Sequence, residues 1–432
     1  MRVVFLCSSL DPGRDGVGDY TRRLAGELIR QGQECRLISL NERNQSKAET
    51  LKTVILKEDA AKFEKSEVSC QLSEISGQKS EVRMQNADLR SPTSDKVLTS
   101  DLRPLTSGSN SPISAFSVSD FQCFQSCEGT EIECLRLPSS LGWPERTVIA
   151  RKWLDDFNPD WVSLQFVPFG FHPKGLPWGL PRQLKFITGP RPLHWMFHEV
   201  WVLWDFPLSL RKRLLGQAQK IWLRSALRKL NPRAVATHLP LYQAGLRKLG
   251  AAADLLPLHG NIPVCSKRDA EQWLVDRCAP LPARKYIKAG FFGDILSTTN
   301  RSLFAARLAG FNVPGKELLV LSAGKLGGEG ARLWDSLAQE FKALATFHRL
   351  GELNEREASW YLSALNHGLT AYPPELSGKS SSVATMREHS LRVTSCGSMG
   401  KTSGLADASQ PTPPWTVAQS ALALLQQLHD NR

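Results

Sequence analysis

Residues 1–40 read MRVVFLCSSLDPGRDGVGDYTRRLAGELIRQGQECRLISL. Val3 to Cys7 predicts a strand, residues 20–31 a helix, and Cys35 to Leu40 a second strand, because each apolar pattern has the period of that element. A glycine-rich turn, residues 15–19, joins the first strand to the helix. Strand, helix and strand in this order form a βαβ unit, the building block of a parallel sheet.

That turn is a candidate ligand contact at Gly16, Val17 and Gly18. Glycine lacks a Cβ, so the backbone there can approach a ligand closely, and a tight turn without a ligand is the alternative interpretation. A dinucleotide fingerprint requires a third glycine three residues after Gly18, and position 21 is Thr21. NAD binding is therefore not favoured.

A second run of small residues, GKSSSV at 378–383, lies near the other end of the chain. It is predicted to end a strand and to begin a helix over residues 382–389. The free N–H groups and the positive dipole end of a helix start suit a phosphate. The run indicates a nucleotide-linked ligand, with simple N-capping by serine as the alternative.

The length of 432 residues predicts two domains, and the composition is typical of a soluble enzyme. The nine cysteines form no CxxC pair or Cys/His cluster, so neither a disulfide framework nor a zinc site is expected, and a reducing cytoplasm fits best. The opening strand is too short for a signal-peptide core, and no later segment reaches about 18 uninterrupted apolar residues. We therefore expect a cytoplasmic chain that is not exported and does not span a membrane.

The formal charge of +12 is compatible with several anionic partners. Residues 211–233 read RKRLLGQAQKIWLRSALRKLNPR and predict a basic amphipathic helix. Its predicted apolar stripe contains Leu214, Leu215, Ala218, Ile221, Trp222 and Leu230. A surface helix packed on its own domain is the simpler interpretation, and peripheral contact with the inner face of a membrane is the alternative.

Strands and helices alternate along most of the chain, as in doubly wound folds. The exception is a polar stretch that lacks the apolar density to offset the entropy of ordering and predicts a disordered insertion. The expected organisation is an N-terminal domain of residues 1–43 and 133–262, an insertion at 44–132, a C-terminal domain at 263–405, and a helix at 414–432 that packs back on the N-terminal domain.

Three stretches carry a family resemblance: residues 15–40, LHWMFHEVW at 193–201, and the long segment 350–393 that contains the glycine-serine turn. Together they resemble bacterial retaining glycosyltransferases of the GT-B fold, close to family 4. The resemblance implies an α/β fold with two Rossmann-like domains facing across a cleft. It also implies a nucleotide-sugar donor on the C-terminal domain, an acceptor on the N-terminal domain, and no required metal or other cofactor.

Residue roles follow from the same resemblance. His198 is expected to contact the donor sugar and Glu388 to bond the ribose hydroxyls, and both are assigned to catalysis. The expected donor-binding residues, with the glycine turns included, are Gly16, Val17, Gly18, Gly293, Lys325, Gly378, Lys379, Ser380, Ser381, Ser382 and Val383. The histidine also has a purely structural interpretation, and Glu388 has one as a carboxylate in the first turns of a helix.

This sequence departs from the family pattern at two points. The family carries two glutamates separated by seven residues, and aligning the second with Glu388 places Ser380 at the first, with Glu375 as a substitute. Asp294 stands where a basic residue is expected, which leaves Lys325 and Lys379 to neutralise the diphosphate.

On the acceptor side, His172 and Lys174 lie on a loop after a predicted strand, where open α/β sheets bind ligands. Trp195, Trp201 and Trp204 are candidates for stacking on a sugar or lipid, with core packing as the alternative.

The resemblance therefore implies a metal-independent hexosyltransferase that uses a nucleotide-sugar donor, and no nucleic-acid partner is expected. Its acceptor is an unidentified sugar, lipid-linked molecule or small molecule. A non-catalytic GT-B-like scaffold that binds nucleotide and a GT-B-fold sugar epimerase are the two alternatives.

Overall fold

The computed structural model describes residues 1–43, 117–202, 210–279, 281, 285–311, 313–398 and 415–432. All helices and strands below belong to one compact unit, Met1–Glu42 with Val118–Arg432. Most of the predicted insertion, residues 44–116, and Trp204 lie outside the described residues. Among the described residues no helix has both the length and the apolar content needed to cross a membrane.

The first sheet contains eight strands in the order β3-β4-β2-β1-β5-β6-β7-β8. Their bounds are β1 Arg2–Cys7, β2 Glu34–Glu42, β3 Gln122–Cys127, β4 Thr130–Pro138, β5 Trp161–Phe166, β6 Leu193–Phe197, β7 Ala234–Thr237 and β8 Asp254–Leu255. Every neighbouring pair is parallel except the β3–β4 hairpin. The strand order runs outward in both directions from β1, so the sheet has a topological switch point between β1 and β5.

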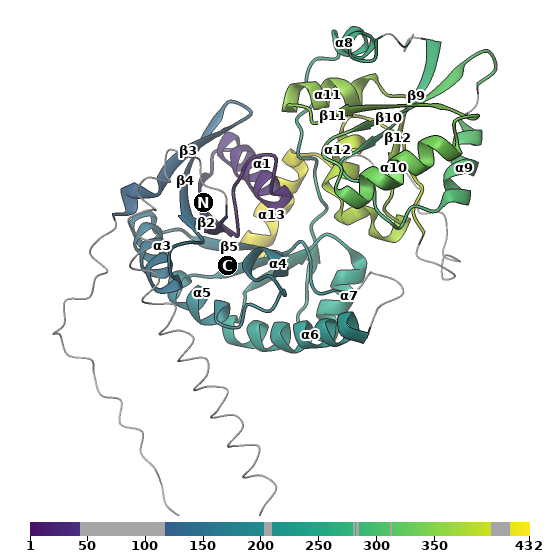
Figure 1. Ribbon diagram of the computed structural model, residues 1–432. Coiled ribbons are helices and arrows are strands. Elements are labelled where there is room, and N and C mark those ends of the chain that lie inside the picture. Colours follow the sequence, from purple (N-terminus) through teal and green to yellow (C-terminus); the bar gives the residue numbers. More distant parts are fainter. Residues whose placement is uncertain (44–116, 203–209, 280, 282–284, 312, 399–414) are drawn as a thin grey trace, which may run out of the picture. The chain divides into compact units, whose positions relative to one another are not determined.

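Helices connect these strands (Figure 1). They are α1 Gly16–Arg30, α3 Trp143–Phe157, α4 Pro168–Phe171, α5 Leu180–Thr188, α6 Leu210–Leu230 and α7 Pro240–Lys248, with a 3₁₀ turn η2 at Val118–Asp120. The central strands β1, β5 and β6 are almost entirely buried, as expected for parallel strands that are covered on both faces.

The second sheet has five parallel strands in the order β11-β10-β9-β12-β13. The strands are β9 Tyr286–Phe292, β10 Glu317–Ala323, β11 Thr346–Gly351, β12 His367–Thr370 and β13 Val393–Ser395. Its helices are α8 Ala270–Arg277, α9 Arg301–Gly310, α10 Gly328–Glu340, α11 Glu355–Ala364, the 3₁₀ helix η4 Pro374–Lys379 and α12 Ser381–Glu388. Its switch point lies between β9 and β12. The prediction of two Rossmann-like α/β sheets is confirmed.

The last helix, α13 Val417–Asp430, belongs to the core of the first sheet rather than the second. Its Ala421, Leu424 and Leu428 are fully buried in the same cluster as Leu24 and Leu28 of α1. Figure 1 shows α1 and α13 side by side. Gln427 also bonds the Val235 carbonyl at 3.0 Å, which fixes α13 to the end of the sheet that carries β7.

Two sequence expectations need correction. Residues 118–132 were assigned to the insertion, yet they form η2, β3 and the start of β4. The two strands are joined by Glu128 and Gly129, which both have positive φ, as a two-residue hairpin requires. The side chains of β3 alternate between exposed and partly buried, and the strand is only weakly apolar. This explains why the composition of the stretch suggested disorder.

The second correction concerns α6. Leu214 and Ile221 were placed on its packed stripe, but their side chains are 62% and 67% exposed. The packed face instead consists of Gly216, Gln219, Trp222, Leu223, Ala226 and Leu227. The apolar residues of α6 are widely spaced and fit two different stripes on the helix surface. The sequence pattern selected the stripe that contains the exposed Leu214 and Ile221.

Candidate functional site

A small pocket lies at the carboxyl ends of β9 and β12, the switch point of the second sheet. Its volume is about 140 Å³. It is lined by Phe291, Phe292, Asp294, Leu296, the segment 369–372, and residues 379–382. Crevices at this position are where open parallel α/β sheets bind ligands.

Two glycines shape one wall of this region. Gly293 follows β9 with φ +90° and donates its N–H to the Ala323 carbonyl at 2.9 Å. Gly324 follows β10 with φ +106°, and a Cβ on it would lie 3.1 Å from the Gly293 backbone. Neither position accepts a side chain without strain, so the two strand ends stay close together.

The N-terminus of α12 opens onto the pocket. Ser380 is the N-cap, and its hydroxyl accepts the Val383 N–H at 3.3 Å. Among the described residues, the N–H groups of Ser381 and Ser382 have no hydrogen-bond acceptor. This helix start is therefore capped by a neutral side chain and keeps free donors for an anion.

The N-terminus of α1 lies beside it but is capped differently. A Cβ on Gly16 would lie 3.8 Å from the Ser381 hydroxyl oxygen, so the two helix starts are close neighbours. The Asp15 carboxylate accepts the N–H groups of Val17 and Gly18 at 3.0 and 3.3 Å, and burial raises its pKa. An acidic side chain thus already occupies the place that an anionic ligand would take at α1.

Gly18 was expected to let the backbone approach a ligand, and the structure gives it another role. A Cβ at this position would lie 2.7 Å from the Ser9 carbonyl oxygen. Glycine is required here because the first turn of α1 packs against the loop that follows β1. Of the two glycines in this turn, Gly16 is the one beside α12.

Lys379 supplies positive charge at the pocket. Its ammonium lies 3.3 Å from a carboxylate oxygen of Glu199 and 5.9 Å from the Tyr372 ring centre. The Lys379 side chain is 17% exposed and that of Glu199 40%. This ion pair is partly open to water, so an anionic ligand can compete with Glu199 for Lys379.

Asp294 lines the same pocket but is engaged by the backbone. Its carboxylate accepts N–H groups from Ile295 at 2.9 Å and from Gly327 at 3.1 Å. Lys325 follows β10 with an exposed side chain and does not line the pocket. Gly378 precedes the pocket segment and packs near Leu239, while Val383 is buried in the core.

Glu388 lies at the opposite end of α12 from the pocket. It is the last residue of this eight-residue helix, so the helix axis separates it from Ser381 by about 10 Å. From the sequence, Glu388 was expected in the first turns of the helix, where a carboxylate complements the dipole. At the actual position it opposes the dipole and needs a cation.

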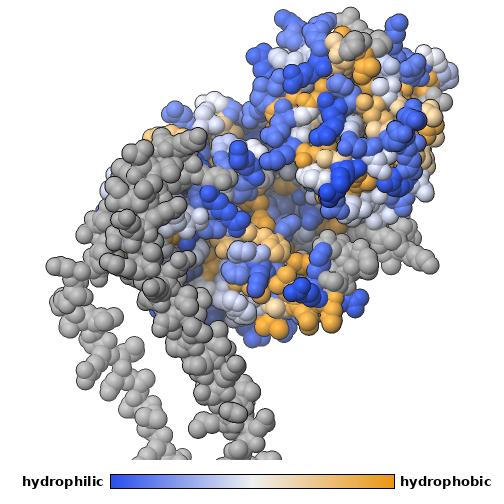
Figure 2. Space-filling view, viewed as in Figure 1, coloured by the Kyte–Doolittle hydropathy of each residue, from blue (hydrophilic) through white to orange (hydrophobic). Residues whose placement is uncertain are grey.

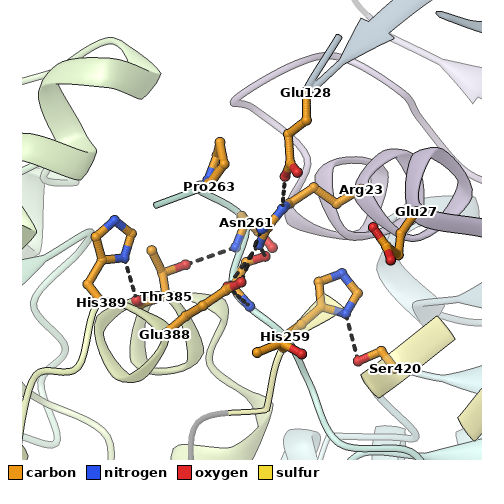
Figure 3. A network of polar contacts seen from close by, with 12 residues as sticks. Arg23, Glu27, Glu128, His259, Asn261, Pro263, Thr385, Glu388, His389 and Ser420 are labelled. Carbon is orange, nitrogen blue, oxygen red and sulfur yellow. Dashed lines mark hydrogen bonds and ion pairs between the residues drawn. The ribbon is translucent and has the colours of Figure 1, made fainter. Parts of the chain in front are cut away.

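Arg23 of α1 is that cation (Figure 3). Its guanidinium makes a bidentate contact with Glu388, at 2.8 and 3.1 Å, and a third contact with Glu128 at 2.5 Å. The Gly260 N–H donates to Glu388 at 3.1 Å, and the Thr385 hydroxyl accepts the Asn261 N–H at 2.9 Å. These contacts tie α12 to α1 and to residues 260–261.

Charge in this network is well compensated. Burial alone lowers the pKa of Arg23, but its bonds to Glu388 and Glu128 outweigh burial and raise it. The Arg23 side chain is 5% exposed and that of Glu388 9%. With both carboxylate oxygens bonded inside the protein, the structure does not bring Glu388 into the pocket with Lys379.

His198 also faces inward. It follows β6 and is 7% exposed, and its Nε2 lies 2.9 Å from the side-chain amide of Gln165. Its Nδ1 lies 2.9 Å from Nε2 of His238, whose Nδ1 contacts the Leu256 carbonyl at 2.8 Å. Burial holds the pKa of His198 well below its usual value and lowers that of His238 to about 4.

The proton positions in this series of hydrogen bonds follow from its last acceptor, the Leu256 carbonyl. The Leu256 carbonyl only accepts, so Nδ1 of His238 carries the proton, and His198 donates from its own Nδ1. Nε2 of His198 is then an acceptor. This requires the Gln165 amide to be turned over, so that its NH₂ faces Nε2 of His198 and its oxygen, instead of its NH₂, faces the Ser163 hydroxyl. Both ring nitrogens are thus used inside the protein, and the histidine is a buried structural link.

The acceptor-side candidates form a turn. Nδ1 of His172 accepts the N–H groups of Lys174 and Leu176 at 3.2 and 3.3 Å. Lys174 is exposed, and its carbonyl accepts from Gln219 of α6. Trp195 is fully buried and Trp201 nearly so, which is the core role that was the alternative to stacking.

The predicted residues therefore separate into two groups. Gly16, Gly293, Lys379 and Ser380 to Ser382 lie together, whereas His198 and Glu388 are bonded elsewhere. Sequence reasoning missed Arg23, Gln165 and His238 because their roles depend on contacts between distant segments. Tyr372 and Glu199 were also missed, although each lies two residues beyond the end of a strand, β12 and β6 respectively.

Comparison with known proteins gives structural similarities only. No protein-family model matches the chain, and no curated protein matches it in sequence. Solved structures similar to it include Anabaena HepE in complex with UDP-glucose, with 12% identity, coverage of 100% of this chain and 97% of that chain, and a TM-score of 0.49.

Two further structures are similar over the whole chain. The catalytic domain of Arabidopsis thaliana starch synthase IV, bound to ADP and acarbose, shares 12% identity, covers 100% of this chain and 92% of its own, and has a TM-score of 0.47. UDP-GlcNAc 2-epimerase from Neisseria meningitidis, bound to UDP-GlcNAc, shares 7% identity over 100% of both chains with a TM-score of 0.42. Similarities of this size do not assign an activity.

Proposed function

We propose that this protein transfers a sugar from a nucleotide-diphosphate donor to an acceptor. The observation that carries the proposal is the helix start at Ser381 and Ser382, which has a neutral cap and free N–H donors and opens with Lys379 onto the pocket at the switch point. These groups are suited to the diphosphate of a nucleotide sugar.

The residues of the pocket have distinct parts in this reaction. The N–H groups of Ser381 and Ser382 hold the β-phosphate oxygens, and Lys379 leaves Glu199 to pair with the diphosphate. Negative charge grows on the diphosphate as the bond to the sugar breaks, so fixed donors here lower the barrier. This positive charge takes the place of a divalent cation, and the proposed reaction is metal-independent.

The pocket is large enough for only part of the donor. A volume of about 140 Å³ is smaller than the roughly 300–1,000 Å³ typical of sites that enclose a whole small ligand. The pocket thus holds the diphosphate, and the nucleoside and sugar extend from it past Asp294 and Tyr372. The acceptor is a sugar, a lipid-linked molecule or a small molecule, and the expected outcome is retention of anomeric configuration in a cytoplasmic enzyme.

A second candidate is nucleotide binding without catalysis. Two specific observations favour it: Glu388 is bonded to Arg23 and Gly260, and His198 is bonded to Gln165 and His238. The side chains assigned to catalysis are therefore not directed at the pocket. A sugar epimerase needs free carboxylates at the reacting carbon, and the pocket-lining carboxylate, Asp294, already accepts two backbone N–H groups.

Calorimetry tests the proposal. The full chain is titrated with UDP, ADP, GDP and their common sugar conjugates, and we expect one nucleotide series to bind. Lys379→Ala should weaken binding about 10- to 100-fold, the value of a hydrogen bond to a charged group. The matched control is Lys342→Ala, an exposed lysine near the opposite end of the strands of the same sheet, which should leave affinity unchanged.

Transfer is then measured with the nucleotide sugar that binds. NMR of the product reports the anomeric configuration, and addition of EDTA should not change the rate. Binding that depends on Lys379 but is accompanied by no turnover or donor hydrolysis supports the non-catalytic candidate. Equal weakening by Lys379→Ala and Lys342→Ala would contradict the assigned pocket.

A further inference from the structure

The outer face of α6 carries three exposed apolar side chains, with the exposed Gln217 between the second and the third. Leu210, Leu214 and Ile221 are 72%, 62% and 67% exposed. They are spaced four and seven residues apart, so they form one stripe on the side of the helix opposite the packed Trp222 and Leu223. Single exposed leucines are common, but a row of three on one helix face is not explained by packing.

Two further exposed aromatic side chains lie on the neighbouring helix α5 and on the loop before it. Trp178, in the loop before α5, is 64% exposed, and Phe186 of α5 is 53% exposed. Helix α5 packs against α6, and Nε1 of Trp222 donates to the Pro177 carbonyl at 3.1 Å, which holds the loop to α6. We call Trp178, Phe186, Leu210, Leu214 and Ile221, with the basic residues of α5 and α6, the α5–α6 surface.

The basic residues of this surface are numerous and have no acidic residues among them. Helix α6 carries Arg211, Lys212, Arg213, Lys220, Arg224, Arg228 and Lys229, and α5 carries Arg182 and Lys185. Neither helix contains Asp or Glu. Arg224 and Arg228 lie on the same side of α6 as the apolar stripe, beyond Ile221. Figure 2 shows hydrophobic and hydrophilic side chains together at the lower edge of the view, where α6 lies in Figure 1.

We propose that the α5–α6 surface binds an anionic phospholipid membrane peripherally. Exposed Leu, Ile, Phe and Trp side chains enter the boundary between headgroups and acyl chains, while Lys and Arg pair with lipid phosphates. Nucleic acid would use the basic residues but leaves the aliphatic stripe in water. An acidic protein is likewise a poorer fit, because it would have to cover an apolar stripe and nine cationic residues at once.

This surface is connected to the segment that reaches the pocket. The Val202 N–H donates to Oε1 of Gln219 in α6 at 2.7 Å, and Glu199, three residues earlier, pairs with Lys379. Membrane binding itself does not depend on the proposed transfer reaction. If both hold, an acceptor carried on a lipid would reach the enzyme at the membrane surface.

Vesicle co-sedimentation tests the proposal with the full chain. Binding to vesicles of phosphatidylcholine with 30% phosphatidylglycerol is compared with binding to phosphatidylcholine alone, at two salt concentrations. We expect partition onto the anionic vesicles that weakens at high salt. The double variant Leu214→Asn, Ile221→Asn and the charge variant Arg224→Glu, Arg228→Glu should each reduce it at least tenfold.

Matched controls lie on other helices. Leu422→Asn changes a 60% exposed leucine of α13, and Arg332→Glu with Lys342→Glu changes two exposed basic residues near α10; both should bind like the parent chain. Circular dichroism checks that every variant folds. The proposal is overturned if the α6 variants sediment like the parent. It is also overturned if the parent ignores anionic vesicles but binds RNA or forms dimers through this surface.

Discussion

The N-termini of α1 and α12 look alike in sequence and differ in the structure. Both follow a glycine-rich or serine-rich turn after a strand, and Gly16 lies beside Ser381. The acidic Asp15 caps α1, whereas the neutral Ser380 caps α12 and leaves two N–H groups without a partner in the part of the chain that the structure describes. The charge of the cap, rather than the presence of glycine, decides which helix start can receive an anion.

The rest of each helix shows the same contrast. Helix α1 is used for packing: Tyr20 stacks on His259 at 4.3 Å and meets His198 edge-on, and Arg23 holds Glu388. Helix α12 uses its far end for packing through Glu388 and turns its start toward the pocket. The comparison predicts that changes in α1 mainly alter stability and that changes at the start of α12 mainly alter ligand binding.

Arg23→Ala should have the largest effect, and it tests the packing role of α1. Removing this cation leaves Glu388 buried and unpaired, which costs about 3–5 kcal/mol of the free energy of unfolding. Denaturant unfolding measures the loss. The double variant Arg23→Ala, Glu388→Gln should recover part of it, since no charge then remains without a partner. A cost below about 1 kcal/mol for Arg23→Ala would show that the network is unimportant.

Acid should weaken the same region through His238. Its pKa is lowered from 6.5 to about 4, so between these values the unfolded chain binds a proton that the folded chain does not. Its contribution is complete above pH 6.5 and is lost as the pH falls toward 4, by at most about 3 kcal/mol. Unfolding at pH 7.5, 5.5 and 4.5 measures this slope, which His238→Gln should flatten. Equal slopes in parent and variant would argue against a neutral buried His238.

Asp15→Ser should have the smallest effect on stability and sharpens the comparison directly. Serine and aspartate are comparable N-caps, so the free energy of unfolding should change by less than about 1 kcal/mol. Removing this carboxylate from the helix start beside α12 should raise nucleotide-diphosphate affinity about two- to fivefold, because a like charge near the ligand is lost. Titration calorimetry measures this, and an unchanged or lower affinity would mean that Asp15 does not repel the ligand.

Much of the fold is readable from local patterns. The βαβ opening and the helix start in the serine run, predicted at residue 382 and observed at Ser381, each follow from apolar period and capping residues within a short window. The β3–β4 hairpin was missed because its strands alternate weakly, although Glu128-Gly129 is a usable turn signal.

The site was harder to predict than the fold. The family resemblance placed Lys379 and Glu388 together at the donor, but α12 separates them. The partner of Glu388 is Arg23, 365 residues away. No local pattern reports such a contact, nor does one report that Ile221 faces water while its neighbour Trp222 is packed. The family resemblance gave roles for His198 and Glu388 that their observed bonds do not support.

The most direct test of the central claim replaces the cap of α12. Ser380→Asp and Ser380→Asn introduce nearly identical shapes, both are good N-caps, and only the first adds the negative charge found at α1. Titration with the nucleotide diphosphate that binds the parent chain compares them. We predict that Ser380→Asn binds within a few-fold of the parent while Ser380→Asp loses at least tenfold in affinity. Equal affinities for the two variants would contradict it.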